Sequence, residues 1–546
     1  MNKGKTILKK INIWQLLFSA LFAGMIIIGK HITYSMYIES NLETVKVYDF
    51  HLIDVIMWII CMCIVYIISD GLEQFFMWSK NLVWKSHQAP GWKVSLLMIY
   101  GITAFFMVCW IPYFMSYWPG GIYSDTVDSI NLALHKSPLD NHNPILYTLI
   151  WRFIFWITGA FSGAGDYPGL KLMTVLQSFV LAASLAVFLT KKKKKGLNKK
   201  IVVLLTLWFA VFPMYPFYGI SLWKDTIFSI VIFGYSIYLY ELFYQSESLQ
   251  KGSLKPISLF FLGIGTSLII FLRNNGIYIA LFYSVVTVLL ILRKKKRKIA
   301  VQLGCLWGAI LVVSALIQGP VYSAKGFNID SSRESMGIPI QQVAYIVSSG
   351  VELQQEDLEI LEAIMPLDNW RACYNPIVTD TIKFDPSFNV AYFEENAGSF
   401  MKTYFHLVAQ YPVMAVKAYF LQTMGFWDIS KYSSTAYICN FHFGNVEYFM
   451  SDYFDYYLNF SFHNLVNPTH YMSAAIFIWI MIYALFSVIK RKQWEKILVI
   501  LPTLGLWLSI MIAVPVAFSF RYIYSIFLCA PLYFFILSGE KERKSE

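Results

Sequence analysis

Long apolar blocks separated by short polar segments make up most of the chain. Most blocks are about 16 to 22 residues long, the length that a helix needs to cross roughly 30 Å of hydrocarbon at about 1.5 Å per residue. The pattern predicts an all-α polytopic membrane protein with about twelve transmembrane helices. The predicted spans are residues 11–29, 51–69, 94–116, 169–190, 201–219, 226–245, 257–272, 275–292, 299–318, 472–490, 497–516 and 521–538.

The composition agrees with a membrane protein. Of the 546 residues, 57% are hydrophobic and only 14% are charged, whereas a soluble domain carries roughly 25% charged residues. A soluble globular protein is therefore excluded. The formal charge of +11 comes from short basic clusters between apolar blocks, where anionic lipid head groups explain them better than nucleic acid does. We expect the lipid bilayer as a partner and no nucleic acid.

The basic clusters predict the orientation in the plasma membrane. If the N-terminus is cytoplasmic, the segments on that side carry 29 of the 44 Lys and Arg residues, including the run from Lys191 to Lys195. The segment 320–470, on the other side, holds 16 Asp and Glu against 7 Lys and Arg. By the positive-inside rule both termini are cytoplasmic, and this acidic segment is external.

This topology divides the chain into four regions. We expect N-terminal transmembrane helices over 1–93, a core over 94–318 with an external loop at 117–168, an external inserted region over 319–471, and C-terminal helices with a cytoplasmic tail over 472–546.

Three segments of the external regions are expected to form helices that do not cross the membrane. Residues 144–161 are apolar enough to span, but a crossing there would place the Lys191 to Lys195 run outside. Arg152 and the surrounding aromatic residues favour a helix in the outer interface. Within the insertion, residues 351–364 predict an acidic helix, and 398–422 predict an amphipathic helix on the membrane surface.

Cys373 and Cys439 are the two cysteines predicted to be external. An oxidising exterior permits a disulfide between them, but the sequence leaves open whether the two residues lie close enough. The sequence contains no zinc-ligand spacing, Walker loop, Gly-rich dinucleotide turn or Ser nucleophile elbow. ATP-driven transport therefore has no support.

Candidate chemistry begins in the loop after the third predicted span. Asp125 and Asp128 are three residues apart, so a helix would place both carboxylates on one face. Such a pair supplies a general base with a partner, or holds a divalent cation such as Mg²⁺ or Mn²⁺ through oxygen ligands. The alternative is a solvated loop with a helix cap. Asp140 and His142, further along the loop, are supporting candidates, although a lone His is more often structural.

Three short external turns carry the candidate cations. Arg offers a planar fork of donors to phosphate, while capping of the helix ends and snorkelling to the head groups are the simpler alternatives. The candidates are Lys224 with Asp225, Arg273 with Asn274 and Asn275, and Arg521 with Tyr522; Gln341 and Gln342, beyond the ninth span, are candidates for substrate binding or helix capping.

Taken in order, these motifs resemble a bacterial family. The set comprises the acidic loop, His142-Asn143-Pro144, Trp223-Lys224-Asp225, Arg273-Asn274-Asn275-Gly276, Gly337-Ile338-Pro339-Ile340-Gln341-Gln342 and Arg521-Tyr522. It is similar to a domain-of-unknown-function family of GT-C-type membrane glycosyltransferases, met mostly in Gram-positive bacteria. The resemblance runs from about Trp110 to the last span, and the first two spans add nothing to it.

The resemblance implies a GT-C-like fold and an inverting transfer of a sugar from a polyprenyl-phosphate donor to a cell-envelope glycan or protein on the external face. Asp125 matches the position of the catalytic base, whereas the His-Pro motif of the wider group is interrupted here by Asn143. Chemistry agrees with this reaction, because it needs a carboxylate base at the membrane surface and cations on the departing phosphate. The candidate phosphate ligands are Lys224, Arg273 and Arg521.

Three other classes of protein remain open. A lipid-linked glycan polymerase or ligase also has a large external loop with basic residues. A secondary transporter or flippase would place its charges near the midplane, whereas here they lie at the outer ends of spans. A scaffold without catalysis is the third.

Overall fold

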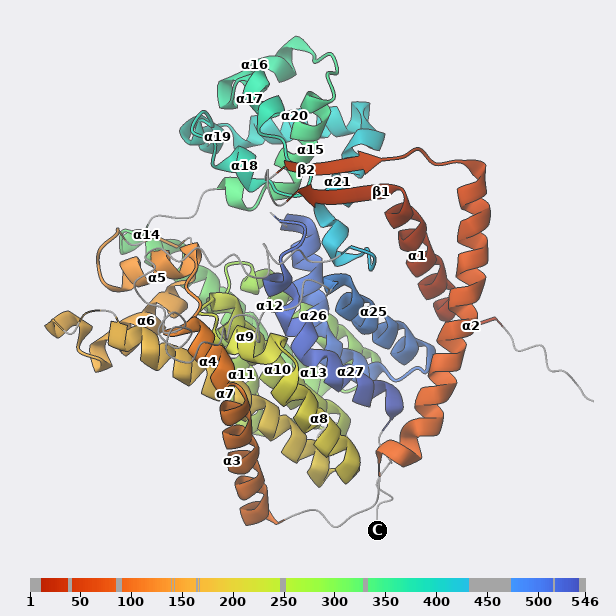
Figure 1. The fold of residues 1–546 in the computed structure, drawn as a ribbon, viewed down its shortest axis with the longest axis vertical. Helices are drawn as coiled ribbons and strands as arrows, with labels where there is room; N and C mark the ends of the chain where they lie inside the picture. Colours follow the sequence, from red (N-terminus) through yellow and green to blue (C-terminus); the bar gives the residue numbers. More distant parts are fainter. Residues whose placement is uncertain are drawn as a thin grey trace, which may run out of the picture.

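The computed structural model describes residues 11–37, 42–84, 91–138, 140–141, 143–163, 165, 167–245, 252–327, 332–431, 473–513 and 516–539. A bundle of long helices carries a smaller helical domain at one end, and a two-stranded hairpin lies beside that domain (Figure 1). The architecture is nearly all-α, as the apolar blocks predict.

The bundle contains the candidate membrane spans. Nine helices of the described residues are long and apolar enough to cross a membrane, and α8 with α9, bent by 50°, makes a tenth candidate. Two shorter apolar helices, α11 and α25, coincide with further predicted spans. The chain is therefore a multi-pass membrane protein, and the count of twelve spans stays a prediction. The helices are α1 (Ile13–Lys30), α2 (Leu52–Val83), α3 (Trp92–Cys109), α4 (Ile111–Tyr117), α7 (Tyr167–Lys194), α8 (Lys199–Val211), α9 (Met214–Ile220), α10 (Lys224–Leu239), η2 (Tyr240–Gln245), α11 (Pro256–Phe271), α12 (Gly276–Arg293), α13 (Arg297–Leu316), η3 (Ile317–Val321), α14 (Tyr322–Ala324), α25 (Ala474–Lys490), α26 (Trp494–Ala513), η7 (Phe520–Ile523) and α27 (Tyr524–Ser538).

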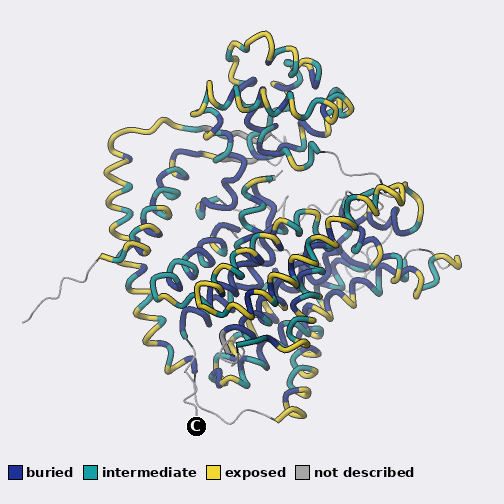
Figure 2. Tube along the Cα trace, turned by 180° about the vertical axis from the view of Figure 1, so that it is seen from behind, coloured by how far each residue is buried: buried dark blue, intermediate teal, exposed yellow. Residues whose placement is uncertain are grey.

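Burial divides the bundle into an inner and an outer set of helices. α10 and α27 are buried over most of their length, whereas much of α2 and α3 is exposed (Figure 2). The exposed residues of α2 and α3 include many large apolar ones, such as Ile60, Trp78 and Leu97. In a bilayer these exposed faces meet lipid tails, so they need no protein partner. The buried α10 is therefore a fixed support for the residues at its N-terminal end, Lys224 and Asp225.

Two short helices, α5 (Ser124–Ala133) and α6 (Ile145–Ile157), lie side by side at the edge of the bundle (Figure 1); η1 (Ala160–Ser162) follows them. The 13 residues of α6 extend about 20 Å, which is too short to cross the hydrocarbon layer. Arg152 on α6 donates from Nε to the carbonyl oxygen of Ala133 at 3.4 Å. The length of α6 supports the prediction of an interfacial helix.

The link between α1 and α2 is an antiparallel hairpin that the apolar pattern did not predict. β1 (Ile32–Tyr37) pairs with β2 (Leu42–Val47), with Ile32 opposite Val47 and Tyr37 opposite Leu42. Both segments are rich in β-branched and aromatic residues, which favour strands. The side chains of Ile32, Val45 and Val47 share an apolar cluster with the inserted domain, so the hairpin has a buried partner.

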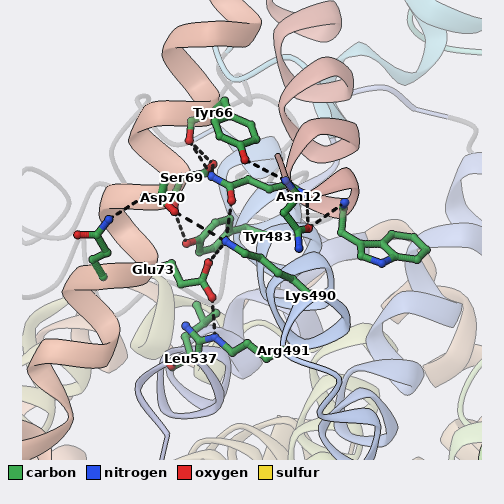
Figure 3. A network of polar contacts seen from close by, with 12 residues as sticks. Asn12, Tyr66, Ser69, Asp70, Glu73, Tyr483, Lys490, Arg491 and Leu537 are labelled. Atoms are coloured by element: carbon green, nitrogen blue, oxygen red, sulfur yellow. Dashed lines mark hydrogen bonds and ion pairs between the residues drawn. The ribbon is translucent and has the colours of Figure 1, made fainter. Parts of the chain in front are cut away.

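The ends of α1 and α2 that lie away from the hairpin are joined to the bundle by a polar network (Figure 3). Lys490 contacts the Glu73 carboxylate and donates to Gln15 Oε1 at 2.6 Å. Arg491 donates from Nε to Glu73 Oε1 at 3.0 Å and from NH1 to the Leu537 carbonyl oxygen at 2.7 Å. One carboxylate on α2 thus holds the end of α25, and through Arg491 also the end of α27.

The inserted domain has its own apolar core. Its elements are η4 (Ser332–Glu334), α15 (Gly337–Ser348), α16 (Gln355–Ile364), α17 (Leu367–Ala372), α18 (Asp380–Lys383), α19 (Val390–Glu395), α20 (Ala397–Gln410), α21 (Pro412–Thr423) and η5 (Met424–Phe426). The acidic helix predicted within 351–364 is confirmed as α16. The prediction of one helix over 398–422 is wrong, because Pro412 starts a second helix and α20 buries Phe400 and Leu407 within the domain core.

Candidate functional site

The candidate site lies at the end of the bundle that faces the inserted domain. Two loops from distant parts of the chain pair through their backbones beside the site. Gly121 N–H donates to the Ile220 carbonyl oxygen, and Leu222 N–H donates to the Gly121 carbonyl oxygen, both at 2.9 Å. Gly120 next to this pairing has a φ of 140°, which favours glycine. The pairing fixes the start of α5 against the start of α10.

Two side-chain hydrogen bonds also hold these paired loops in place. The Leu222 carbonyl oxygen accepts from the Thr126 hydroxyl at 2.7 Å and from the Tyr147 hydroxyl at 2.6 Å. Burial raises the pKa of Tyr147, so its phenol stays protonated and acts as a donor. Because α5, α6 and α10 meet at one carbonyl, the acidic loop has a defined position relative to Lys224.

Asp125 lies at the centre of the site, between two cations. Arg521 NH1 is 3.0 Å from Asp125 Oδ2, and Lys224 Nζ is 3.5 Å from the same oxygen. The side chains of Asp125, Lys224 and Arg521 are 21%, 18% and 22% exposed, so solvent or a ligand has access to all three. The structure therefore brings together one predicted carboxylate and two predicted phosphate ligands.

Arg273 belongs to a second, more deeply buried pair. Its NH1 donates to Asp225 Oδ1 at 2.7 Å, and its Nε donates to Asn275 Oδ1 at 2.9 Å. The guanidinium also lies over the rings of Phe228 and Tyr522, at 5.4 and 5.5 Å. Arg273 is thus held on both edges and between two rings, a geometry that favours a positioning role for it. Its assignment as a phosphate ligand stays a prediction.

Asn143 is a site residue that sequence reasoning missed. It is fully buried, and its Oδ1 accepts from Lys224 Nζ at 2.6 Å. Asn143 lies directly before Pro144, in the interrupted His-Pro motif. That interruption was the available signal in the sequence. His142, which was the predicted site residue of this motif, lies outside the described residues.

Aromatic residues also line the site, and Tyr123 is the one among them that the sequence analysis did not predict. The rings of Tyr123 and Trp223 stack with their centroids 3.6 Å apart. Arg521 lies over Trp223 at 5.4 Å and over Tyr522 at 5.2 Å. Such cation–π contacts hold a guanidinium in place without using its N–H donors.

Comparison with known proteins gives a family. Residues 133–546 match a family described as "Family of unknown function (DUF6020)". The chain belongs to this family. The description names no activity, and the glycosyltransferase class implied by the resemblance does not follow from it. The comparisons with curated proteins and with solved structures find no match.

Most of the candidate site falls within the region that matches the DUF6020 family. Asn143, Lys224, Arg273 and Arg521 all lie between residues 133 and 546, whereas Asp125 lies just before it. The family match therefore covers the cations of the site but not the central carboxylate.

The remaining predicted residues of this DUF6020 member are placed as follows. Asp128 is on the exposed side of α5, and Asp140 is half-buried. Asn274 Nδ2 donates to the Asn141 carbonyl oxygen at 2.9 Å, which ties the turn before α12 to the acidic loop. Asn275 Nδ2 donates to Ser509 Oγ, also at 2.9 Å.

Gln341 and Gln342 make contacts inside the inserted domain. Gln341 donates to the Asn375 carbonyl oxygen, and Gln342 donates to the Ala415 carbonyl oxygen at 2.8 Å and accepts from the Tyr404 hydroxyl at 2.8 Å. None of these bonds reaches the Asp125 cluster. The geometry favours a structural role for both amides.

The inserted domain is nevertheless connected to the site through the backbone. Val378 and Val516 form an isolated antiparallel bridge, and Ala517 N–H donates to the Ile377 carbonyl oxygen at 2.9 Å. The bridged segment precedes Arg521 by a few residues. The domain therefore helps to position the cation that contacts Asp125.

The donor set around Asp125 does not fit a resident divalent cation. Within the described ranges, no three His, Cys, Asp or Glu side chains gather closely enough to hold a metal ion. The contacted Asp125 oxygen also faces two positive groups, whereas Mg²⁺ and Mn²⁺ require converging oxygen ligands.

Proposed function

We propose that this protein is a membrane glycosyltransferase that moves a sugar from a polyprenyl-phosphate donor to an acceptor of the cell envelope by inverting single displacement. The observation that carries the proposal is the contact of one accessible carboxylate, Asp125, with two cations, Lys224 and Arg521. The reaction requires a base for the acceptor hydroxyl and cations for the departing phosphate, and this cluster supplies both.

Each group has a role in the displacement. Asp125 takes the proton of the acceptor hydroxyl as that oxygen forms a bond to the anomeric carbon of the sugar. The bond from this carbon to the phosphate oxygen breaks, and the lipid phosphate leaves with the electron pair. Lys224 and Arg521 stabilise the negative charge that develops on it. Asn143 holds the Lys224 ammonium in position through its Oδ1.

The location of the site suits a lipid-linked donor. Asp125 lies on α5, which packs against the short apolar helix α6, and the exposed side of α6 carries large apolar residues, among them Phe153 and Trp156. A helix of this kind is suited to the head-group layer. A polyprenyl phosphate has its reactive carbon at that depth, so we place the active site on the external face of the plasma membrane.

The test uses purified protein in nanodiscs with labelled polyprenyl-phosphate sugars and cell-envelope acceptor fractions. Asp125→Asn keeps the size of the side chain but removes the proton acceptor, so turnover should fall by about 10²- to 10⁴-fold with the fold intact. Asp128→Asn, which makes the same change on the exposed side of α5, should retain most activity. Normal transfer by Asp125→Asn would reject this base. Unchanged envelope glycans in cells lacking the protein would count against the transferase itself.

A further inference from the structure

We infer that the donor phosphate competes with Asp125 for Lys224 and Arg521, so that donor binding itself releases the carboxylate to act as a base. This inference rests on the proposed transferase function and adds a binding order to it. The donor must bind before the acceptor hydroxyl loses its proton.

The first support is that both cations contact the same oxygen. Arg521 NH1 and Lys224 Nζ lie 3.0 and 3.5 Å from Asp125 Oδ2. A carboxylate oxygen held by two positive groups is a poor proton acceptor, because both contacts favour its charged form. In the arrangement observed, the candidate base is paired with the groups that the phosphate needs.

The second support is that Lys224 and Arg521 differ from Arg273 in how their donors are engaged. The side chains of Lys224 and Arg521 are 18% and 22% exposed, and the other contact of an Arg521 nitrogen, from NH2 to the Tyr522 hydroxyl, is long at 3.5 Å. Arg273 has short bonds to both Asp225 and Asn275. We therefore expect a phosphate to bind Lys224 and Arg521, where it competes with the Asp125 carboxylate for the same N–H donors.

The third support is the charge of the cluster. Asp125 with Lys224 and Arg521 carries one excess positive charge, whereas Asp225 with Arg273 is neutral. Other titratable groups that act on the site are the protonated phenol of Tyr147 and the carboxylates of Asp225 and Asp380. Asp380 is itself paired with Lys383 at 3.1 Å. The excess positive charge attracts a phosphate, whose oxygens then take over the charge-assisted hydrogen bonds. Asn143 keeps Lys224 in place during this exchange.

The test measures binding rather than turnover. A polyprenyl phosphate without sugar is titrated onto full-length protein in nanodiscs, and its dissociation constant is compared between the wild type and Asp125→Asn. Removal of the competing carboxylate should tighten binding by roughly fivefold, the fold-change expected for loss of a partly exposed ion pair. Arg521→Gln should weaken binding. Inorganic phosphate, titrated alone, should also bind more tightly to Asp125→Asn, because the contested contacts are with the phosphate.

Asp128→Asn is the matched control, because it removes the same charge three residues away on α5 and should change the dissociation constant by less than about twofold. An equal gain in Asp128→Asn would show a general charge effect and overturn the inference. Equal or weaker binding by Asp125→Asn, or by Asp125→Ser if the Asn variant does not fold, would also overturn it. Failure of the wild type to bind any polyprenyl phosphate would instead reject the proposed function.

Discussion

At the scale of single residues, the two ion pairs of the site differ in burial. Asp125 and its cations are accessible, whereas the Asp225 side chain is only 3% exposed. An accessible pair is free to exchange partners, but a buried carboxylate that loses its cation stays desolvated. Substitutions at the two pairs are therefore expected to have different consequences.

Arg273→Ala should destabilise the fold. It leaves the Asp225 carboxylate without its cation, and breaking a buried pair costs about 3–5 kcal/mol. Arg273→Lys keeps the charge but loses the fork that reaches both Asp225 and Asn275, so its cost should be smaller, about 1–3 kcal/mol. Thermal unfolding in detergent measures both. An Arg273→Ala protein of unchanged stability that fails only to bind the donor would restore Arg273 as a phosphate ligand.

Cys373 should be a slow nucleophile. Burial, together with the nearby Asp385, raises the pKa of its thiol to about 11, and the thiol donates to Asp385 Oδ2 at 3.2 Å. At pH 8 only about one thiol in a thousand is then ionised, and alkylation should accelerate as the pH rises toward 11. Mass spectrometry of the reduced protein after iodoacetamide treatment measures this rate.

Asp385→Ala provides the comparison for Cys373, because it removes the charge that disfavours the thiolate and should speed alkylation at pH 8. An unchanged rate in this variant would contradict the contribution of Asp385 and leave burial as the cause of the raised pKa. The structure does not test the disulfide that the sequence permits between Cys373 and Cys439, since Cys439 lies outside the described residues.

At the scale of elements, the Glu73 carboxylate is one of the polar groups that join the N-terminal helix pair to the bundle. Glu73→Gln removes the charge that Lys490 and Arg491 share (Figure 3). We expect a loss of about 1–3 kcal/mol, because two charge-assisted contacts weaken at partly buried positions. Thermal unfolding measures the loss.

The matched control for Glu73 is Glu356→Gln. Glu356 is 89% exposed and lies 3.9 Å from Lys402, so its loss should change stability by less than about 0.5 kcal/mol. Equal effects of the two changes would contradict a docking role for Glu73.

At the scale of the whole molecule, the topology is the main prediction. The 29 basic residues assigned to one side predict that Gly196 lies inside and Ser332 outside. In a cysteine-accessibility experiment on intact cells, a membrane-impermeant reagent should label Ser332→Cys but not Gly196→Cys. Positions 140 and 164 should both be accessible from outside if α6 does not cross. Labelling of Gly196→Cys alone would invert the orientation.

The sequence predicted the helices of the bundle closely. Each of the twelve predicted spans overlaps a helix of the structure, from α1 to α27, because the cost of placing polar groups in hydrocarbon acts on each segment separately. The sequence was less successful with the hairpin β1–β2 and with the break at Pro412. The hairpin is stabilised by burial against the inserted domain, and the helices on either side of Pro412 are stabilised by burial within that domain. Such contacts between distant segments are not visible in the sequence of one segment.

The candidate site shows the same division. By itself, the sequence determined which polar residues lie at the ends of apolar blocks, since hydrophobic length and charge are local properties. Only the tertiary structure decided that Asp125 meets Arg521, 396 residues away, that Arg273 is engaged by Asp225, and that Gln341 bonds within the inserted domain. The tertiary structure also brought Asn143 Oδ1 within hydrogen-bonding distance of Lys224 Nζ. Ion pairs and hydrogen bonds form between side chains that packing brings within about 3 Å, and packing depends on every helix at once.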